Sequence, residues 1–417
     1  MKPGVSLKSR HVLFLTYHLP LENEPGAFRP WMEARLLVRA GYKVTVVTSG
    51  VQYMTGEDIR PYKAWCTEEF VEGVRILRTW APKDHRRSLL RRVSNYLSYT
   101  ILAGLASVLR VQKIDRIFAG TDPIFMMPMV YFISLIKKAP MVMDERDLYP
   151  ETAIALGVIK PGALSDILFQ IQQFFRRKAV GILAATPGIK KRLLSYGVPE
   201  GKVYLLYNAH VFVDDDTEPK YEIESLRELT HRKFLVGYVG GLGRANDIPT
   251  LLRAAERLKD MKQVGFVIVG SGEMRKSYID FCKRKGLDNV TFLPAVPRKQ
   301  ARALVKQLDV CVQPLPQDGH FLSTLTSKTF DYHALGKPMI FCGSGDTAEL
   351  LKESGGGIVV SPEDDQLLAR AIKRLVKDEK LRKEMGKSAK EWFKENISIS
   401  AAISIIIKTL GFCNERN

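Results

Sequence analysis

The sequence predicts an α/β protein made of two doubly wound domains that face a central cleft. Three observations support this prediction: a length of 417 residues, apolar runs that alternate with amphipathic stretches, and a polar break near the middle. A chain of this length exceeds one ordinary core. Apolar strands separated by helices are typical of parallel sheets covered on both faces, so two such series indicate two domains. Ligands of these domains bind at the carboxyl ends of the strands, which makes the cleft the expected site.

The first half holds seven strand candidates, each a short apolar run. They cover residues 11–17, 44–49, 75–80, 115–120, 141–145, 181–186 and 203–208. Helical patterns lie between them. In ALSDILFQIQQFFRRKA (163–179), for example, apolar residues keep i, i+3, i+4, i+7 spacing. The first domain is therefore predicted to span residues 1–209.

The second half begins after a polar stretch. Residues 210–233 are acidic and have no apolar period, so we predict a linker there. A second series of apolar runs follows and predicts a domain over residues 234–392. Its strand candidates are residues 234–240, 265–270, 290–295, 310–315, 338–343 and 357–362.

Composition narrows the class of protein. The five cysteines are scattered and form no CxxC pair, which argues against a disulfide framework or a structural zinc site and favours a reducing, intracellular compartment. The start of the chain lacks a signal-peptide pattern. A net charge of +18 implies a polyanionic partner, namely nucleic acid, an acidic membrane or a phosphorylated substrate, unless the whole proteome is basic. No helix-turn-helix pattern and no interleaving of aromatics with arginines is present, so we predict no nucleic-acid partner.

Two glycine-rich turns follow the first two strands of the second half. The first contains Gly240 and Gly241, and the second contains Gly270 and Gly272. Either turn alone has a steric explanation, because a turn after a buried strand often needs glycine. Two such turns at strand ends in one domain favour a phosphate-binding site, where backbone N–H groups meet an anion.

The stretch TLTSKTFDYHALGKPMI (324–340) adds a second phosphate-binding candidate. A helix starting near Thr326 would present the N–H groups of Ser327, Lys328 and Thr329, with the lysine ammonium as counter-charge. One turn later, Asp331 is suited to accept hydrogen bonds from ribose hydroxyls. The alternative is an ordinary capped helix with an exposed lysine.

These motifs resemble those of a known family. GYVGGLGRANDIPTLLRAA, IVGSGEMR and TSKTFDYHALGKPMIFCGSGDTAELL are similar to the nucleotide-sugar half of retaining glycosyltransferases of the GT-B type, which have two Rossmann-like domains. The chain is identified as a member of the glycosyltransferase group 1 family and most resembles bacterial colanic acid and O-antigen glycosyltransferases. In the first half, PGAFRPWMEARLLVRAGYKVTVVTSG and MDERDLYPETAIALGV resemble the acceptor side. The resemblance also implies that a C-terminal helix, residues 393–417, crosses back onto the first domain.

The resemblance assigns roles to individual residues. It implies that catalysis involves Asp147, Arg146, Arg244 and Lys328. Donor binding is implied for Gly240, Gly241, Gly270, Gly272, Ser327, Lys328, Thr329, Asp331 and Glu349. The acceptor side is implied to include Gly26 and Arg29.

The sequence departs from the family at three places. Ser323 stands where many relatives have the first of two glutamates, and Asn246 stands where they often have a lysine. NAHV (208–211) replaces the usual interdomain motif. These departures leave the transferred sugar open.

The resemblance implies transfer of a hexosyl or N-acetylhexosaminyl group from a nucleoside-diphosphate sugar, expected to be a UDP-sugar, with retention of configuration. Surface polysaccharide or glycoconjugate biosynthesis is the expected setting. We predict no metal and no cofactor besides the nucleotide-sugar co-substrate. Two alternatives stay open: a catalytically inactive sugar-nucleotide-binding protein, and a sugar-nucleotide epimerase of the same architecture.

One segment concentrates positive charge. Within residues 83–92 stand five cations, and the uncharged residues 93–109 follow at once. The segment favours a peripheral enzyme at the cytoplasmic face of an anionic membrane, acting on a lipid-linked acceptor. The alternative is a solvated turn before a buried helix. The five cations are Lys83, Arg86, Arg87, Arg91 and Arg92.

Overall fold

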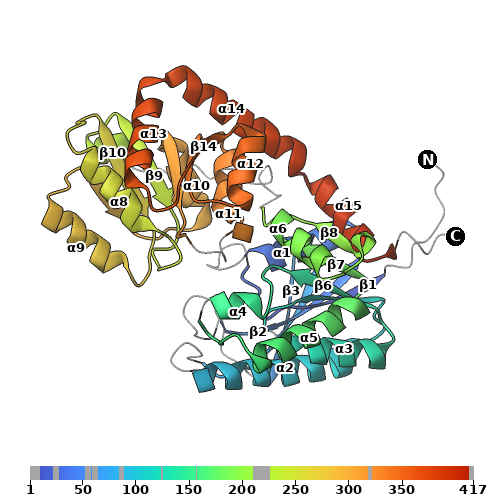
Figure 1. The fold of residues 1–417 in the computed structure, drawn as a ribbon. Coiled ribbons are helices and arrows are strands. Elements are labelled where there is room, and N and C mark those ends of the chain that lie inside the picture. The colour runs from blue at the N-terminus through green and yellow to red at the C-terminus, as the bar shows by residue number, and fades with distance from the viewer. Residues whose placement is uncertain are drawn as a thin grey trace, which may run out of the picture. The chain divides into compact units, whose positions relative to one another are not determined.

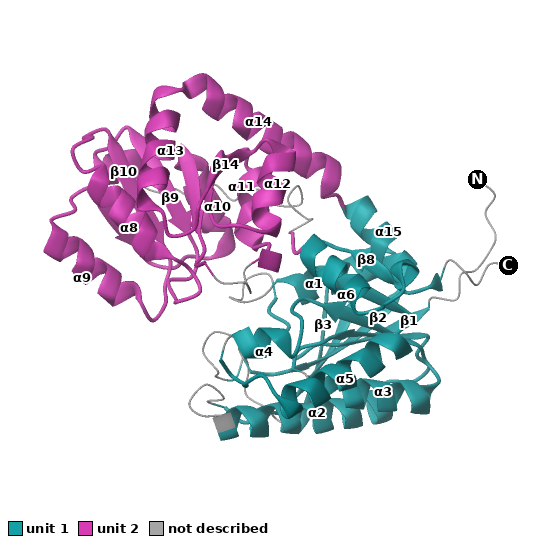
Figure 2. Cartoon of the chain, viewed as in Figure 1, with its two compact units in different colours: residues 1–207, 399–417 teal, residues 208–398 magenta. Residues whose placement is uncertain are grey.

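The structure is a computed structural model whose described residues are 10–21, 28–51, 58, 64–83, 89–123, 125–155, 157–209, 226–317 and 322–412. The chain divides into two compact units (Figure 2). Unit 1 comprises residues 1–207 and 399–417, and unit 2 comprises residues 208–398. The C-terminal segment of unit 1 thus begins at residue 399, six residues later than the sequence suggested.

Unit 1 is built on an eight-stranded sheet with the order β3-β4-β2-β1-β5-β6-β7-β8. All neighbouring pairs are parallel except β3 and β4, and β1 pairs with both β2 and β5. Its four strands β1, β5, β6 and β7 are fully buried, as continuous apolar runs require. The strands are β1 (His11–Leu15), β2 (Lys43–Ser49), β3 (Cys66–Val71), β4 (Val74–Thr79), β5 (Arg116–Gly120), β6 (Met141–Glu145), β7 (Gly181–Ala184) and β8 (Val203–Leu205).

Helices cover both faces of this sheet. Figure 1 shows α2, α3 and α5 side by side on one face. On the other face α15 contacts α1, β7 and β8, so the end of the chain completes the first unit. The helices are α1 (Arg29–Arg39), α2 (Leu89–Arg110), α3 (Met126–Lys137), α4 (Glu151–Ala155), α5 (Ala163–Lys178), α6 (Pro187–Ser195) and α15 (Ile399–Thr409), with a short 3-10 helix at Glu200–Lys202.

Unit 2 has a six-stranded parallel sheet with the order β11-β10-β9-β12-β13-β14. Helix α8 packs on α9 and α13, and α11 packs on α14. The strands are β9 (Phe234–Val239), β10 (Val264–Val269), β11 (Val290–Leu293), β12 (Val310–Pro314), β13 (Met339–Cys342) and β14 (Gly357–Val360). The helices are α7 (Leu226–Thr230), α8 (Ile248–Arg257), α9 (Arg275–Lys285), α10 (Arg298–Gln307), α11 (Ser327–Ala334), α12 (Asp346–Ser354), α13 (Asp365–Lys377) and α14 (Glu379–Asn396).

The segment expected to be a linker is partly folded. Residues 210–225 lie outside the described residues, but α7 occupies residues 226–230. Arg227 pairs with Asp309 at 2.9 Å, and the backbone N–H of Leu226 donates to Gln307 Oε1 at 2.8 Å. These contacts attach α7 to unit 2, so its first helix precedes β9.

Both sheets reverse their strand order once. In unit 1 the reversal lies between β1 and β5, and in unit 2 between β9 and β12. The carboxyl ends of strands at such a switch point form the usual ligand site of an open α/β sheet. Among the described residues, no helix is both long enough and apolar enough to cross a membrane.

Candidate functional site

In unit 2, Lys328 lies in the first turn of α11, next to the loop that follows β9. Its Nζ is 5.7 Å from the centroid of the Tyr238 ring. A Cβ atom added to Gly240 would lie 2.6 Å from Lys328 Cε, so glycine at this position leaves the space that the lysine side chain occupies. Desolvation lowers the pKa of Lys328 to about 8, and the charge of Asp331 opposes that shift. An anion bound beside this poorly solvated ammonium would stabilise its charged form.

The glycine-rich loops after β9 and β10 pack against each other. Gly240 N donates to Val269 O at 2.9 Å. Gly270 adopts φ +153°, and a Cβ there would lie only 1.9 Å from Gly240 O, so this close approach requires glycine. Gly272 similarly lies against Leu242. Gly241 differs from these three glycines, since it is exposed and a Cβ there would meet nothing within 4 Å. Of the four predicted glycines, Gly241 is therefore the one beside which a ligand has free space.

The start of α11, which carries Lys328, is held in place by hydrogen bonds to β12. Thr326 Oγ1 and Thr329 Oγ1 both donate to Gln313 Oε1 at 3.0 Å. Thr329 is fully buried, and its backbone N–H, which was expected to meet the donor, donates to Thr326 O at 3.1 Å, so this residue positions the helix. Ser327 is exposed in the same turn.

Asp331 lies one turn after Lys328 and faces two arginines of α10. Its Oδ1 is 2.6 Å from Arg298 Nη2 and 3.4 Å from Arg302 Nη1. The sequence prediction did not include these two arginines, although their i, i+4 spacing on one helix places them on one face. They hold the carboxylate in a fixed position near the start of α11.

Two other predicted residues are largely exposed. Arg244 is 85% exposed and lies 3.5 Å from Glu273. Glu349 is 71% exposed and pairs with Lys352 at 2.8 Å. Such surface pairs add little to stability, so both side chains are available to solvent in unit 2.

Unit 1 holds a cluster of four ionisable side chains that joins the start of α1 to the end of β6. Arg29 Nη2 lies 2.7 Å from Asp144 Oδ1 and its Nε lies 2.9 Å from Glu33 Oε1. Arg29 Nη1 also donates to Leu206 O at 2.6 Å. Arg146 Nε reaches Asp144 Oδ2 at 2.5 Å from the opposite side. Asp144 thus receives a guanidinium on each carboxylate oxygen.

The electrostatics of this cluster separate its two acids. Burial raises the pKa of Glu33, and the Asp144 charge adds to that shift. Burial acts in the same direction on Asp144, but Arg29 and Arg146 outweigh it and lower the pKa of that carboxyl. Asp144 is therefore the ionised partner, and Glu33 is the acid that most readily accepts a proton.

The cluster changes the interpretation of the acceptor-side residues. Arg29 is 2% exposed and engaged on three sides, so it does not line a binding wall as expected. It supports Arg146 through Asp144 instead. Gly26, its predicted companion, lies outside the described residues.

Three charged residues in or next to this cluster are accessible to a ligand. Arg146 is partly exposed, and its Nη2 lies 3.4 Å from the Cβ position of Gly120 at the end of β5. Asp147 is exposed beside it. Asp122, two residues beyond β5, was not predicted; the residue is exposed, and desolvation of its carboxyl together with the charge of Asp147 raises its pKa. A cation and two carboxylates thus follow the ends of β5 and β6, which suits recognition of a polyhydroxyl ligand.

Among the residues that the structure describes, no group of three or more His, Cys, Asp or Glu is placed to hold a metal ion.

Both halves of the chain match glycosyltransferase families. Residues 29–209 match the family described as glycosyl transferase 4-like domain, and residues 222–392 match glycosyl transferases group 1. An uncharacterized glycosyltransferase of Methanocaldococcus jannaschii is 25% identical over 216 residues, covering 50% of this chain and 54% of that protein. The chain thus spans about half the length of that relative.

Two further proteins align along most of the chain. A protein of Escherichia coli named as a colanic acid biosynthesis glycosyl transferase is 22% identical over 362 residues, covering 84% of this chain and 86% of that protein. The structure of HepE from Anabaena, solved in complex with UDP-glucose, superposes with a TM-score of 0.68 at 15% identity. That superposition covers 96% of this chain and 99% of HepE. This likeness shows that the fold is GT-B.

Proposed function

We propose that the protein transfers a sugar from a UDP-sugar to an acceptor hydroxyl with retention of configuration. The matches of residues 29–209 to the glycosyl transferase 4-like domain and of residues 222–392 to glycosyl transferases group 1 support this proposal. The observation that carries the proposal is the placement of Lys328, a half-buried cation with a lowered pKa at a helix start and beside an open glycine turn. HepE, of the same fold, was solved with UDP-glucose, which supports a uridine nucleotide as the donor.

In the proposed complex, unit 2 holds the donor. The diphosphate lies between Lys328, the N–H groups at the start of α11 and the open surface at Gly241. Ser327 adds a hydroxyl in the same turn. Asp331 accepts hydrogen bonds from the ribose hydroxyls, and Arg298 orients its carboxylate. Arg244 and Glu349, both exposed, approach the donor from the rim.

The proposed reaction breaks the bond between the anomeric carbon and the diphosphate oxygen, and the electron pair leaves with UDP. The acceptor oxygen forms the new bond on the same face of the sugar. Its proton passes to the leaving phosphate oxygen, so the products are the glycosylated acceptor and UDP. Lys328 and the α11 dipole stabilise the negative charge that develops on the diphosphate.

Unit 1 is proposed to bind the acceptor and the transferred sugar. Asp147 accepts hydrogen bonds from sugar hydroxyls, and Arg146 donates to an oxygen of the sugar or the acceptor. The buried pair of Asp144 and Arg29 keeps Arg146 in position. A hexosyl or N-acetylhexosaminyl group fits these contacts, because each offers several hydroxyls.

We further propose that the acceptor is linked to a lipid and that the enzyme works in surface polysaccharide or glycoconjugate synthesis, peripherally at the cytoplasmic face of a membrane. The net charge of +18 supports attraction to an anionic surface. Of the basic segment, Arg86 and Arg87 lie outside the described residues, Arg91 is exposed, and Lys83 pairs with Asp58 at 2.9 Å.

The test is release of UDP from a panel of UDP-sugars, measured with and without a lipid extract that supplies acceptors. Transfer predicts UDP release that depends on one sugar and increases with acceptor. Binding of UDP without any release would identify a sugar-nucleotide-binding protein, and conversion of the sugar without loss of UDP would identify an epimerase.

A further inference from the structure

The outward surface of α2, α3 and α5 carries more exposed apolar side chains than the rest of the described chain. Among the described residues, nineteen large apolar side chains are exposed. Thirteen of them belong to these helices and the residue preceding α3, whereas the described part of unit 2 contributes two, Leu229 and Leu322. We call this surface the three-helix face. It comprises Leu90, Leu97, Ile101, Leu105, Leu109, Phe125, Phe132, Leu135, Ile136, Leu164, Ile167, Ile171 and Phe174.

The apolar character of α2 is not a consequence of its packing on the sheet. Its inward side buries Tyr99 and Ala103, as a surface helix requires. Its outward side repeats Leu97, Ile101 and Leu105 at intervals of four residues, with exposures of 42%, 59% and 43%. An outward face in water is normally charged, as the Lys and Glu residues of α14 illustrate.

The three helices form one continuous surface. Figure 1 shows them side by side, and α2 packs against α3. The ring of Tyr131 on α3 meets Phe174 on α5 edge-on at 5.3 Å. Contiguous exposed apolar area of this kind indicates a site of contact with a protein or a membrane.

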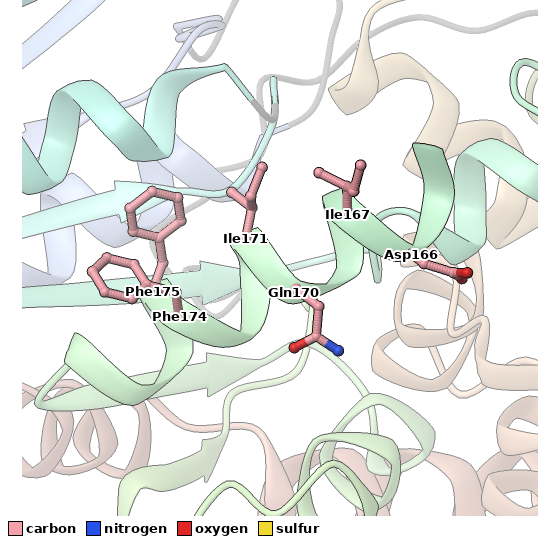
Figure 3. Close-up of a pocket in the computed structure, with 6 residues that line it drawn as sticks. All are labelled: Asp166, Ile167, Gln170, Ile171, Phe174 and Phe175. Carbon is pink, nitrogen blue, oxygen red and sulfur yellow. The ribbon is translucent and has the colours of Figure 1, made fainter. Parts of the chain in front are cut away.

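The surface is also hollowed along α5. A shallow groove of about 490 Å³ is lined by four apolar side chains and by Asp166 and Gln170. In Figure 3, Ile167 and Ile171 point to the same side of α5, with Phe174 and Phe175 in the following turn. An acyl or prenyl chain would find apolar walls there. The four apolar residues are Ile167, Ile171, Phe174 and Phe175.

Charge on the three helices is almost entirely positive. Asp166 is the one acidic residue in their sequences. Cations stand at the helix ends, while residues 93–109 carry no charge. Cations at the C-terminal ends also complement the helix dipoles, but that effect does not account for the apolar band between the ends. The exposed or partly exposed cations are Arg91, Arg92, Arg110, Lys137, Lys138, Arg177 and Lys178.

We propose that the three-helix face inserts into an anionic membrane, with its apolar band among the lipid chains and its cations at the headgroups. The inference rests on the proposed membrane-bound acceptor and names the surface that reaches it. A second copy of the chain is a poorer occupant, because a two-fold interface would bring the same cations together. An anionic membrane matches both properties of the three-helix face, because its lipid chains accept the apolar band and its negative headgroups attract the cations.

The test measures flotation with vesicles of phosphatidylcholine, alone or mixed equally with phosphatidylglycerol, at low and high salt. We expect the protein to bind the anionic vesicles and to retain part of this binding at high salt, because apolar insertion is not screened. Replacing Leu97, Ile101 and Leu105 together with serine should weaken partitioning by at least roughly tenfold, the value of burying about one such side chain.

Phe70→Ser is the matched control, since Phe70 is 71% exposed on β3 and lies off the face. It should leave vesicle binding unchanged. Ile101→Trp should gain fluorescence that brominated lipid quenches, which reports insertion directly. Thermal unfolding and UDP binding, measured on every variant, establish that each is folded.

Three results would overturn the inference. The first is the absence of binding to anionic vesicles, and the second is binding that salt abolishes and the triple replacement leaves intact. The third is a dimer in solution that the triple replacement dissociates. Failure of the proposed function looks different, because vesicle binding would persist in a protein that releases no UDP from any UDP-sugar.

Discussion

Replacing Lys328 with alanine is expected to weaken UDP binding by roughly 10- to 150-fold, the equivalent of about 1.5–3 kcal/mol for one charge-assisted hydrogen bond. The upper part of this range is expected, because the ammonium is half-buried and poorly solvated before UDP binds. Titration calorimetry with UDP measures the effect without any knowledge of the acceptor. The folded state should lose little, since Lys328 lies in the first turn of α11 and is not among the buried residues of that helix.

Gly240 provides a second, coupled perturbation. In the wild type, a Cβ at this position would lie 2.6 Å from Lys328 Cε and 3.0 Å from Tyr238 Oη. Gly240→Ala should therefore displace the lysine and weaken UDP binding on its own. In the Lys328→Ala background the main obstacle is gone, so the same change should cost much less. Additive losses in this double-mutant cycle would show that the two residues act independently.

The affinity for UDP should also depend on pH and should fall as the pH rises. Because the pKa of free Lys328 is about 8 and a bound diphosphate would raise it, UDP binding takes up a proton above that pH. Affinity should stay level from neutrality to about pH 8 and fall at higher pH, and the fall should vanish in Lys328→Ala. Equal affinities of wild type and variant at neutral pH would refute the assignment of Lys328 to the phosphates.

Three further changes test other parts of the sites. Asp147→Asn should lower the rate of transfer at least roughly tenfold, the value of one charge-assisted hydrogen bond, and leave UDP affinity intact; an equal loss of UDP binding would place this residue in the donor site. Asp331→Ala should remove the preference for UDP over 2′-deoxy-UDP, measured by calorimetry, and a preserved preference would contradict the ribose contact. Because burial raises the pKa of Glu33, its contribution to stability is complete below the ordinary glutamate range and is lost as pH rises through the raised pKa. Glu33→Gln should therefore flatten the decline of the unfolding free energy with rising pH, measured by urea denaturation, and an unchanged slope would show that another group causes it.

Most strands could be predicted because buried parallel strands are continuous apolar runs. Strand β3 was missed for the opposite reason. Its sequence, CTEEFV, lies at the edge of the sheet and alternates between partly buried and exposed residues. The antiparallel turn to β4 did leave one signal in the sequence, Gly73. In the structure Glu72 and Gly73 both have positive φ, as a two-residue type I′ hairpin turn requires.

The sequence predicted the secondary structure around a candidate residue, but it could not predict contacts between residues that are distant in the sequence. The sequence predicted that Lys328 lies at a helix start, and α11 does begin at Ser327. The burial of Thr329 could not be foreseen, because it depends on Gln313 of β12. The pair of Arg29 and Asp144 joins residues 115 positions apart. A hint was present, since MVMDE ends a buried strand with two acids, and buried acids need cationic partners.

The return of α15 to unit 1 makes that unit discontinuous, with residues 208–398 inserted between its two parts. During synthesis, β7 and β8 must wait for about two hundred residues before α15 is available to cover them. Unit 2, being one uninterrupted stretch, can fold before unit 1 is complete, which reverses the usual order of N-terminal before C-terminal. Excision should follow the same topology. Residues 208–398 should fold when expressed alone, whereas residues 1–207 should need α15 supplied, for example by a direct fusion of Tyr207 to Ile399.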